Sequence, residues 1–144
     1  MREYQSLAHT KWDCKYHVVF IPKYRKKVIY GDLRQHLGEI FHELAGYREC
    51  RIEDGHLMGD HVHMCVSIPP KIAVSSAVGY LKGKSAIAIA RRFGKKVRNF
   101  KGENFWARGF FVSTVGLDEA VVREYLRTQV ERDKYFEQMS LLDR

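Results

Sequence analysis

The segment from residue 61 to residue 68 constrains the fold of this chain more than any other. Its sequence, HVHMCVSI, alternates polar and apolar side chains without a break, and two prolines follow it. Successive side chains of a strand point to opposite faces of a sheet, so the alternation separates two sets. The apolar set, which belongs on the core, is Val62, Met64, Val66 and Ile68. The polar set, which belongs on an open face, is His61, His63, Cys65 and Ser67.

Three further strands are predicted around this one. Residues 16–21 (YHVVFI) are rich in β-branched and aromatic side chains and end at Pro22. Residues 50–58 form a strand that a tight turn at Gly59-Asp60 joins to the histidine strand as a hairpin. A last strand is expected within residues 109–115, because Gly116 interrupts the pattern there.

Three helices are predicted between and after the strands. The first begins at an Asp32 cap, follows the helical period of its apolar residues and stops near Gly46. The second covers about residues 74–93, and the third runs from an Asp118 cap to about Gln138. The order β-α-β-β-α-β-α predicts an α+β fold, a ferredoxin-like antiparallel sheet with an extra C-terminal helix. Helices are expected on one face of this sheet, which leaves the other face open for function.

Length and composition indicate one domain spanning residues 1–144. The chain is 45% hydrophobic and 12% aromatic, which argues against disorder. No apolar run approaches a membrane span, and the N-terminal residues lack the apolar core of a signal peptide. The three cysteines are widely spaced and form no CxxC pair, which fits a reducing compartment. We therefore expect a cytoplasmic protein without a membrane partner.

The charge of the chain points to a polyanionic partner. Twenty-five Lys and Arg against seventeen Asp and Glu give a net charge of +8, as expected of a nucleic-acid binder. Residues 91–101 are strongly basic, contain no acid and include two phenylalanines, a composition typical of single-strand binding surfaces. A basic protein without such a partner, or a solvated loop before a core strand, is the alternative. The candidate DNA-binding residues are Lys82, Lys84, Arg91, Arg92, Lys95, Lys96, Trp106 and Arg108.

His61 and His63 are candidate metal ligands. Seven histidines in 144 residues give about a third of one His-x-His match by chance, so the pair needs structural context. Side chains at i and i+2 of a strand leave the backbone about 6–7 Å apart on one face, which lets both imidazoles reach one ion. Two solvated histidines on an exposed face are the alternative. A structural zinc site is not expected, because it needs four ligands and usually paired cysteines.

The last helix carries a tyrosine and a glutamine one turn apart. Tyr125 and Gln129 lie at the edge of the apolar stripe formed by Val122, Leu126 and Val130. A glutamine carbonyl is the kind of oxygen ligand that magnesium or manganese prefers. A phenol has a pKa of about 10 and needs a divalent ion on the scissile phosphate to attack phosphorus. An ordinary tyrosine at the edge of the core would leave the same pattern.

Together these segments resemble the small single-tyrosine HUH transposases (TnpA-like) of bacterial insertion sequences. The resemblance is carried by the HVH pair with SIPPK, by LKGKS, by FWARGFFVSTVG and by REYLRTQ, and it extends from about Lys15 to Gln138. It implies that His61, His63 and Gln129 bind a divalent metal, Mg²⁺ or Mn²⁺, and that Tyr125 is the nucleophile.

The resemblance also implies an activity and partners. Tyr125 would attack a phosphate of single-stranded DNA and form a 5′-phosphotyrosine, and the released 3′-hydroxyl would allow rejoining without ATP. The expected partners are single-stranded DNA with a hairpin at the element's ends and a second copy of the chain. In such a homodimer the tyrosine helix of one subunit can complete the active site of the other.

Three other functions share single features with a transposase of this kind. GYLKGKS has three residues between its glycines where a P-loop has four, so nucleotide hydrolysis is rejected. A non-catalytic RNA-binding RRM module shares the element order, but RGFFV lacks the small residue of its RNP1 motif. An HUH replication initiator or relaxase remains an alternative, although such proteins usually bring additional domains.

Overall fold

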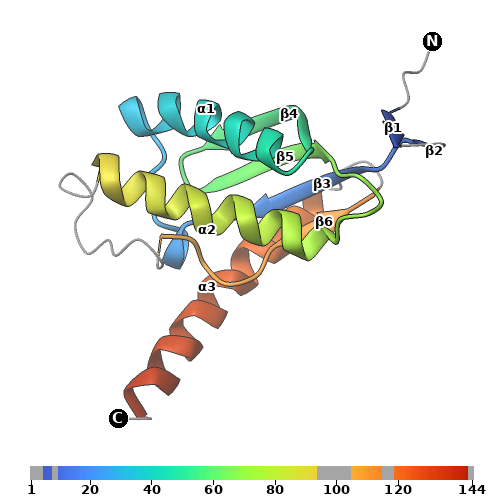
Figure 1. The fold of residues 1–144 in the computed structure, drawn as a ribbon. Helices are drawn as coiled ribbons and strands as arrows, with labels where there is room; N and C mark the ends of the chain where they lie inside the picture. Colours follow the sequence, from blue (N-terminus) through green and yellow to red (C-terminus); the bar gives the residue numbers. More distant parts are fainter. Residues whose placement is uncertain (1–4, 8–9, 94–104, 115–118, 143–144) are drawn as a thin grey trace.

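The computed structural model describes residues 5–7, 10–93, 105–114 and 119–142. Its strands are β1 (Gln5–Leu7), β2 (Thr10–Trp12), β3 (Lys15–Phe20), β4 (Arg51–Met58), β5 (His61–Ser67) and β6 (Phe111–Ser113). Its helices are α1 (Gly31–Tyr47), α2 (Val74–Phe93), α3 (Glu119–Leu142) and the short 3-10 turn η1 (Lys23–Arg25). Figure 1 shows α1 and α2 lying side by side and α3 running away from them.

The four-stranded sheet confirms the ferredoxin-like α+β fold. Its strand order is β4-β5-β3-β6, and every neighbouring pair is antiparallel. The hairpin between β4 and β5 turns at Gly59 and Asp60 as predicted and pairs Met58 with His61. A separate two-stranded hairpin, β1-β2, precedes the sheet and was not predicted from the sequence.

The side-chain parity of β5 is confirmed. Its apolar set, Val62, Met64 and Val66, is almost fully buried in the main core, together with Ile68 beyond the strand. Tyr16, Val18 and Phe20 of β3 contribute to the same core. The helices α1 and α2 cover this face because their apolar stripes pack on it, and the polar residues of β5 point the other way.

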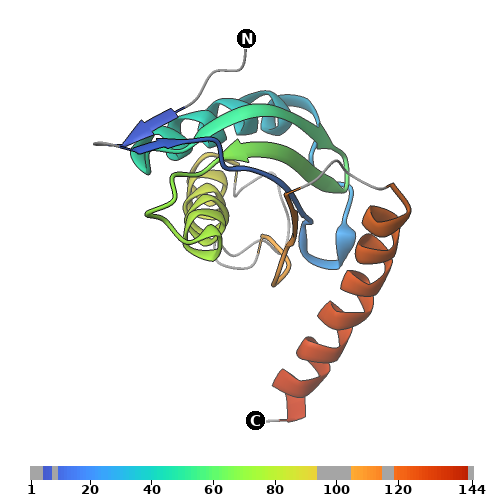
Figure 2. The same cartoon turned by 90° about the vertical axis from the view of Figure 1, so that its right-hand side faces the viewer.

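The second face of the sheet is only partly open. A smaller apolar cluster joins Val19 and Ile21 to Ala107 and Leu126, with Tyr125 packed at its edge. α3 therefore packs on the face opposite α1 and α2, beside β3 and β6. The expectation of helices on one face holds for α1 and α2, while the tyrosine helix lies on the histidine face. Figure 2 shows that α3 stands apart from the other helices and that its C-terminal end projects away from the sheet.

The helix ends differ in detail from the prediction. α1 begins after Tyr30 with no side-chain cap, and Asp32 lies in the first turn, where its charge suits the helix dipole. The helix passes through Gly46, and Glu49 takes the left-handed conformation (φ 59°) just beyond the end. α2 has the predicted limits. The predicted cap of α3, Asp118, lies outside the described residues.

Two consecutive non-glycine residues of η1, Tyr24 and Arg25, adopt left-handed backbone angles (φ 61° and 54°). Such a conformation costs about 1–2 kcal/mol per residue. Neighbouring segments hold the turn in place: the Lys23 N–H donates to the Phe105 carbonyl and the Tyr24 N–H to the Asp133 carboxylate, both at 2.9 Å. The turn therefore owes its shape to contacts from distant parts of the chain.

Trp106 is a core residue. Its ring packs edge-on against Phe20 and Phe105, at centroid distances of 4.8 and 4.6 Å, and its indole N–H donates to the Ser85 hydroxyl. The side chain is 6% exposed. The prediction of Trp106 as a DNA-binding residue is therefore corrected, because a buried indole offers no free ring face to a base.

Trp106→Ala should lower the free energy of unfolding by about 3–5 kcal/mol, because it leaves a large cavity and removes the buried hydrogen bond that the Ser85 hydroxyl accepts. Urea unfolding followed by far-UV circular dichroism measures the change. Tyr30→Ala is the control, since Tyr30 is 69% exposed and its loss should change stability by no more than about 0.5 kcal/mol. Equal effects of the two substitutions would contradict the core position of Trp106.

Candidate active site

Four histidines gather on the face of the sheet opposite the main core. His61 and His63 come from β5, and the β4–β5 register places His56 directly opposite His63. The rings of His56 and His63 lie 5.9 Å apart, and those of His17, from β3, and His63 lie 6.2 Å apart. His63 therefore stands at the centre of a row of imidazoles that crosses three strands.

His61 is oriented by the residue before it. Its Nδ1 lies 2.8 Å from Oδ1 of Asp60, whose Oδ2 accepts a hydrogen bond from Arg25 Nε at 2.8 Å. Burial raises the pKa of Asp60, but the His61 hydrogen bond and the Arg25 charge outweigh it and hold the pKa below its usual range. Since an ionised carboxylate only accepts hydrogen bonds, Nδ1 of His61 carries the hydrogen, and in the neutral form of the ring Nε2 has the lone pair.

His63 lies in surroundings that favour its neutral form. Burial lowers the pKa of this imidazole, and the neighbouring His56 and His17 lower it further. A neutral imidazole is the form that binds metal ions. In the described ranges, no group of three or more His, Cys, Asp or Glu side chains is arranged to hold a metal ion. A metal at the histidine pair would therefore need a different third ligand from the protein.

Tyr125 lies on the same face of the sheet, on the other side of β3. Its ring is 6.1 Å from that of Phe111, and the sheet register runs from Phe111 through Val19 to His63. Two strand spacings of this kind amount to about 10 Å at the backbone. The structure therefore brings the tyrosine and the histidine pair onto one surface, with β3 between them.

The phenol of Tyr125 is shielded. Its oxygen is buried and has no hydrogen-bond partner in the described part of the chain. Burial raises the pKa of the phenol well above its usual value, the Asp133 charge raises it further and Arg132 opposes this shift. The hydroxyl is therefore protonated and shielded from solvent in this conformation.

Gln129 is 2% exposed, and its hydrogen bonds fix the orientation of its amide. The amide nitrogen donates to the Arg108 carbonyl, and a side-chain hydrogen bond joins Gln129 to Asp133. Both partners are acceptors, so both bonds use the amide nitrogen. The carboxamide oxygen is thus the atom available to bind a metal ion.

Asp133, which the sequence reasoning missed, completes the buried face of α3 and is also 2% exposed. Burial raises the pKa of its carboxyl, and Lys23, Lys82 and Arg132 offset this only in part. The stripe predicted from Val122, Leu126 and Val130 is only partly correct, since Gln129 and Asp133 are more buried than either valine. The i, i+4, i+8 spacing of Tyr125, Gln129 and Asp133 could have indicated that Asp133 lies on the same side of the helix as the other two.

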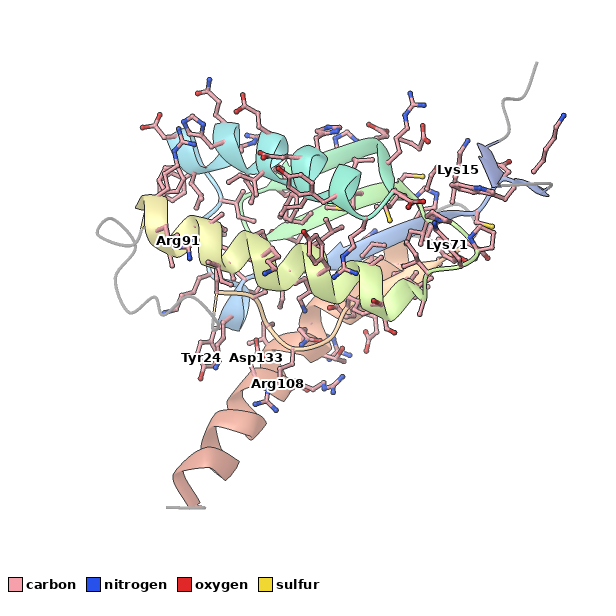
Figure 3. The ribbon with its side chains drawn as sticks, in the orientation of Figure 1. Lys15, Tyr24, Lys71, Arg91, Arg108 and Asp133 are labelled. Atoms are coloured by element: carbon pink, nitrogen blue, oxygen red, sulfur yellow. The ribbon has the colours of Figure 1, made fainter. Side chains whose placement is uncertain are left out.

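Apart from the buried Trp106, the candidate DNA-binding residues fall into three groups. Lys84, Arg91, Arg92 and Arg108 are exposed, whereas Lys95 and Lys96 lie outside the described residues. A groove of about 470 Å³ runs between α2 and residues 106–108 and is lined by Lys84 and Arg108 among others. Figure 3 shows Arg91 near the end of α2, and Arg108 with Tyr24 and Asp133 where α3 meets the body.

Lys82 forms the third group, because its ammonium is used inside the protein. It donates to the carbonyls of Ala107 and Gly109, each at 2.7 Å. Burial lowers the pKa of Lys82 to about 8, against the charge of Asp133. These bonds tie residues 107–109 to α2, so we leave Lys82 out of the proposed DNA contacts.

Comparison with known proteins defines the class of this protein. The family model described as "Transposase IS200 like" matches residues 10–129. The chain is 44% identical over 141 residues to the transposase for insertion sequence element IS200 of Salmonella typhimurium, across 98% of this chain and 93% of that protein. It is 26% identical over 123 residues to the ISDra2 transposase TnpA of Deinococcus radiodurans, across 85% of this chain and 88% of that one.

Two solved structures share the fold. A crystal structure of a Deinococcus radiodurans protein described as a transposase aligns with a TM-score of 0.76 at 24% identity, over 90% of this chain and 98% of that one. A REP-associated tyrosine transposase bound to a REP hairpin aligns with a TM-score of 0.55 at 14% identity, over 86% and 68%.

The protein is thus a transposase, an enzyme of DNA transposition and recombination. The chain belongs to the IS200-like transposase family, and a TnpA protein is among its relatives. The RRM and replication-initiator alternatives are thereby set aside. None of the helices in the described ranges combines the length and the apolar character that crossing a bilayer requires.

The titration of Lys82 gives a test of its burial. Its pKa is about 8 in the folded chain and 10.5 in an unperturbed lysine, so between these values the unfolded chain binds more protons. The free energy of unfolding of the wild type should therefore rise with pH from about 8 to about 10.5, relative to Lys82→Met.

Urea titrations across that pH range measure this slope. Lys84→Met is the matched control, because it removes an exposed lysine from the same helix. Curves for the wild type and Lys82→Met that stay parallel over the whole range would contradict the internal position of the Lys82 ammonium.

Proposed function

We propose that this transposase cleaves and rejoins single-stranded DNA at the ends of an insertion sequence, with Tyr125 as its nucleophile. The observation that carries the proposal is the docking of α3, which puts Tyr125 and Gln129 on the polar face of the sheet that bears His61 and His63. Family membership supports the same chemistry, because it makes DNA strand transfer the reaction to be explained.

We further propose that His61, His63 and Gln129 bind one divalent ion, Mg²⁺ or Mn²⁺. The donor set fits such an ion: Asp60 leaves Nε2 of His61 with a free lone pair, and the bonds of Gln129 leave its carboxamide oxygen available. When bound, the ion supplies positive charge on the scissile phosphate and polarises its P–O bond.

The cleavage step transfers one phosphodiester bond. The Tyr125 oxygen attacks phosphorus and forms a 5′-phosphotyrosine, while the bond from phosphorus to the 3′-oxygen breaks and that oxygen takes up a proton. The phenol proton must leave at the same stage, since the phenol is protonated in the described conformation. A 3′-hydroxyl from another strand end reverses the attack and joins new ends, which conserves bond energy.

The DNA partner that we propose is a hairpin with single-stranded flanks. A structural relative, the REP-associated tyrosine transposase, is bound to a REP hairpin, which supports this class of substrate. Exposed basic residues on α2 and at Arg108 supply charge for phosphate contacts, and two of them, Lys84 and Arg108, line the α2 groove. These residues are Lys84, Arg91, Arg92 and Arg108. We propose Lys95 and Lys96 as additional contacts because they extend the same basic segment.

We also propose a homodimer, as the family resemblance implies. In the described chain α3 packs on its own sheet, so an exchange of α3 between subunits would have to break the Tyr24–Asp133 bond. Mixing Tyr125→Phe with His61→Ala protein distinguishes the two arrangements. Activity in the mixture requires active sites shared between subunits, and sedimentation equilibrium reports the dimer itself.

Tyr125→Phe should abolish the covalent protein–DNA species and leave hairpin binding and thermal stability nearly unchanged. The phenylalanine ring keeps the packing against Phe111, and the lost hydroxyl has no hydrogen-bond partner among the described residues. Denaturing gels with labelled single-stranded DNA and Mg²⁺ detect the adduct. Tyr30→Phe, at an exposed position, is the control and should form the adduct normally. An adduct that persists in Tyr125→Phe would mean that another residue is the nucleophile.

Removal of divalent ions with EDTA should stop DNA cleavage, and added Mg²⁺ or Mn²⁺ should restore it. His61→Ala should lower the single-turnover cleavage rate by at least about 100-fold, because a site that loses one of two imidazole ligands binds the ion poorly. His42→Ala removes an exposed imidazole from α1 and serves as control. Cleavage that proceeds unchanged in EDTA would refute the proposed metal site.

A further inference from the structure

We infer that the turn η1 positions both proposed sets of metal ligands, with Asp60 acting on His61 and Asp133 acting on Gln129. The inference rests on the proposed function and goes beyond it, because it assigns positioning roles to Arg25, Asp60 and Asp133. None of these side chains needs to touch DNA or the ion. They act by orienting the side chains of His61 and Gln129, so that Nε2 of the histidine and the carboxamide oxygen of the glutamine face the metal site.

On the strand side, the chain of contacts runs from η1 to the first histidine. Arg25 Nε donates to Oδ2 of Asp60 at 2.8 Å, and Oδ1 of Asp60 accepts from Nδ1 of His61 at 2.8 Å. The two oxygens of one carboxylate thus serve two different partners. Such a carboxylate fixes the ring orientation and the tautomer of a ligating histidine, and it leaves Nε2 toward the metal. Asp60 also occupies the β4–β5 turn, so its backbone is fixed by the hairpin.

On the helix side, the contacts run from η1 to the glutamine. The Tyr24 N–H donates to Oδ2 of Asp133 at 2.9 Å, and Asp133 accepts a hydrogen bond from the Gln129 amide. The Arg108 carbonyl accepts the other amide bond. With its nitrogen occupied twice, the amide cannot rotate without losing a buried hydrogen bond. The Arg108 carbonyl and Asp133 therefore together present the oxygen of Gln129, and not its nitrogen, as a ligand.

The two sides meet in adjacent residues of η1. Tyr24 contacts α3 through its backbone, and Arg25 contacts the hairpin turn through its side chain. Both residues hold left-handed angles that their neighbours must maintain. A shift of α3 that breaks the Asp133 bond would release the turn and with it the Arg25–Asp60 pair. The position of the tyrosine helix and the orientation of His61 are thereby coupled.

The test uses the full-length protein and two readouts, only one of which involves metal. Long-range ¹H–¹⁵N NMR at pH 8 on the metal-free protein reports the His61 tautomer. The wild type should show the form protonated at Nδ1, and Asp60→Asn should shift the ring toward the form protonated at Nε2. Asparagine suits the turn position, so the hairpin is expected to be retained. Thermal unfolding of each variant verifies this.

The second readout is the affinity for Mn²⁺, measured by titration calorimetry. Asp60→Asn and Asp133→Asn should each raise Kd by about 10- to 100-fold. Coupling through η1 predicts that the double variant loses less than the product of the two single losses. Glu124→Gln, which removes an exposed carboxylate from α3, is the matched control and should leave Kd unchanged. Arg25→Lys keeps the charge but not the Nε donor and should reproduce part of the Asp60→Asn effect.

The outcomes separate the inference from the proposed function. A wild-type protein that binds no Mn²⁺ contradicts the proposed metal site and the positioning roles together. A wild type that binds Mn²⁺ while Asp60→Asn and Asp133→Asn bind it equally well overturns the inference alone. A wild-type His61 protonated at Nε2, or strictly multiplicative losses in the double variant, also overturns it.

Discussion

The buried carboxylate of Asp133 is the interaction on which the arrangement of this transposase depends. A charge removed from water must be paired, and this one receives hydrogen bonds from the Tyr24 backbone and from Gln129, with Lys23 and Lys82 close by. Because these partners come from η1, α2 and α3, one carboxylate joins the tyrosine helix to the body of the protein. Among the described side chains of α3, the apolar contact with the sheet centres on Leu126. The polar contacts of Asp133 add to it and help to define where the helix sits.

The sequence predicted those features of the fold that a short local residue pattern determines. Strict alternation in residues 61–68 fixed the two faces of the sheet, and Gly59-Asp60 fixed the hairpin. The β1-β2 hairpin was missed because strands of three residues carry too little pattern. The residue pattern of α3 alone did not give the side of the sheet on which it packs; only the metal role that the resemblance implied for Gln129 pointed to the histidine face. That choice depends on long-range contacts, such as Val19 with Leu126, which no local period encodes.

The site could be predicted only in part. The alternation of side chains along a strand predicted that His61 and His63 lie on one face of the sheet. The i, i+4 spacing predicted that Tyr125 and Gln129 lie on one side of the last helix. The hairpin register would also have placed His56 opposite His63, had it been followed back from the turn. The prediction for Trp106 was wrong because an aromatic residue beside a basic segment is found both where it stacks on bases and where it fills a core. The tertiary contacts that decide between these two roles are absent from the sequence pattern.

The central claim is that Tyr125 becomes covalently bonded to DNA, and peptide mass spectrometry tests it most directly. The adduct formed with single-stranded DNA and Mg²⁺ is digested with nuclease and trypsin, and the modified peptide is sequenced. Cleavage after Arg123 and Arg127 isolates residues 124–127, which contain a single tyrosine. The account predicts a nucleotide remnant on Tyr125 in this peptide. A remnant on any other residue of the chain would contradict it.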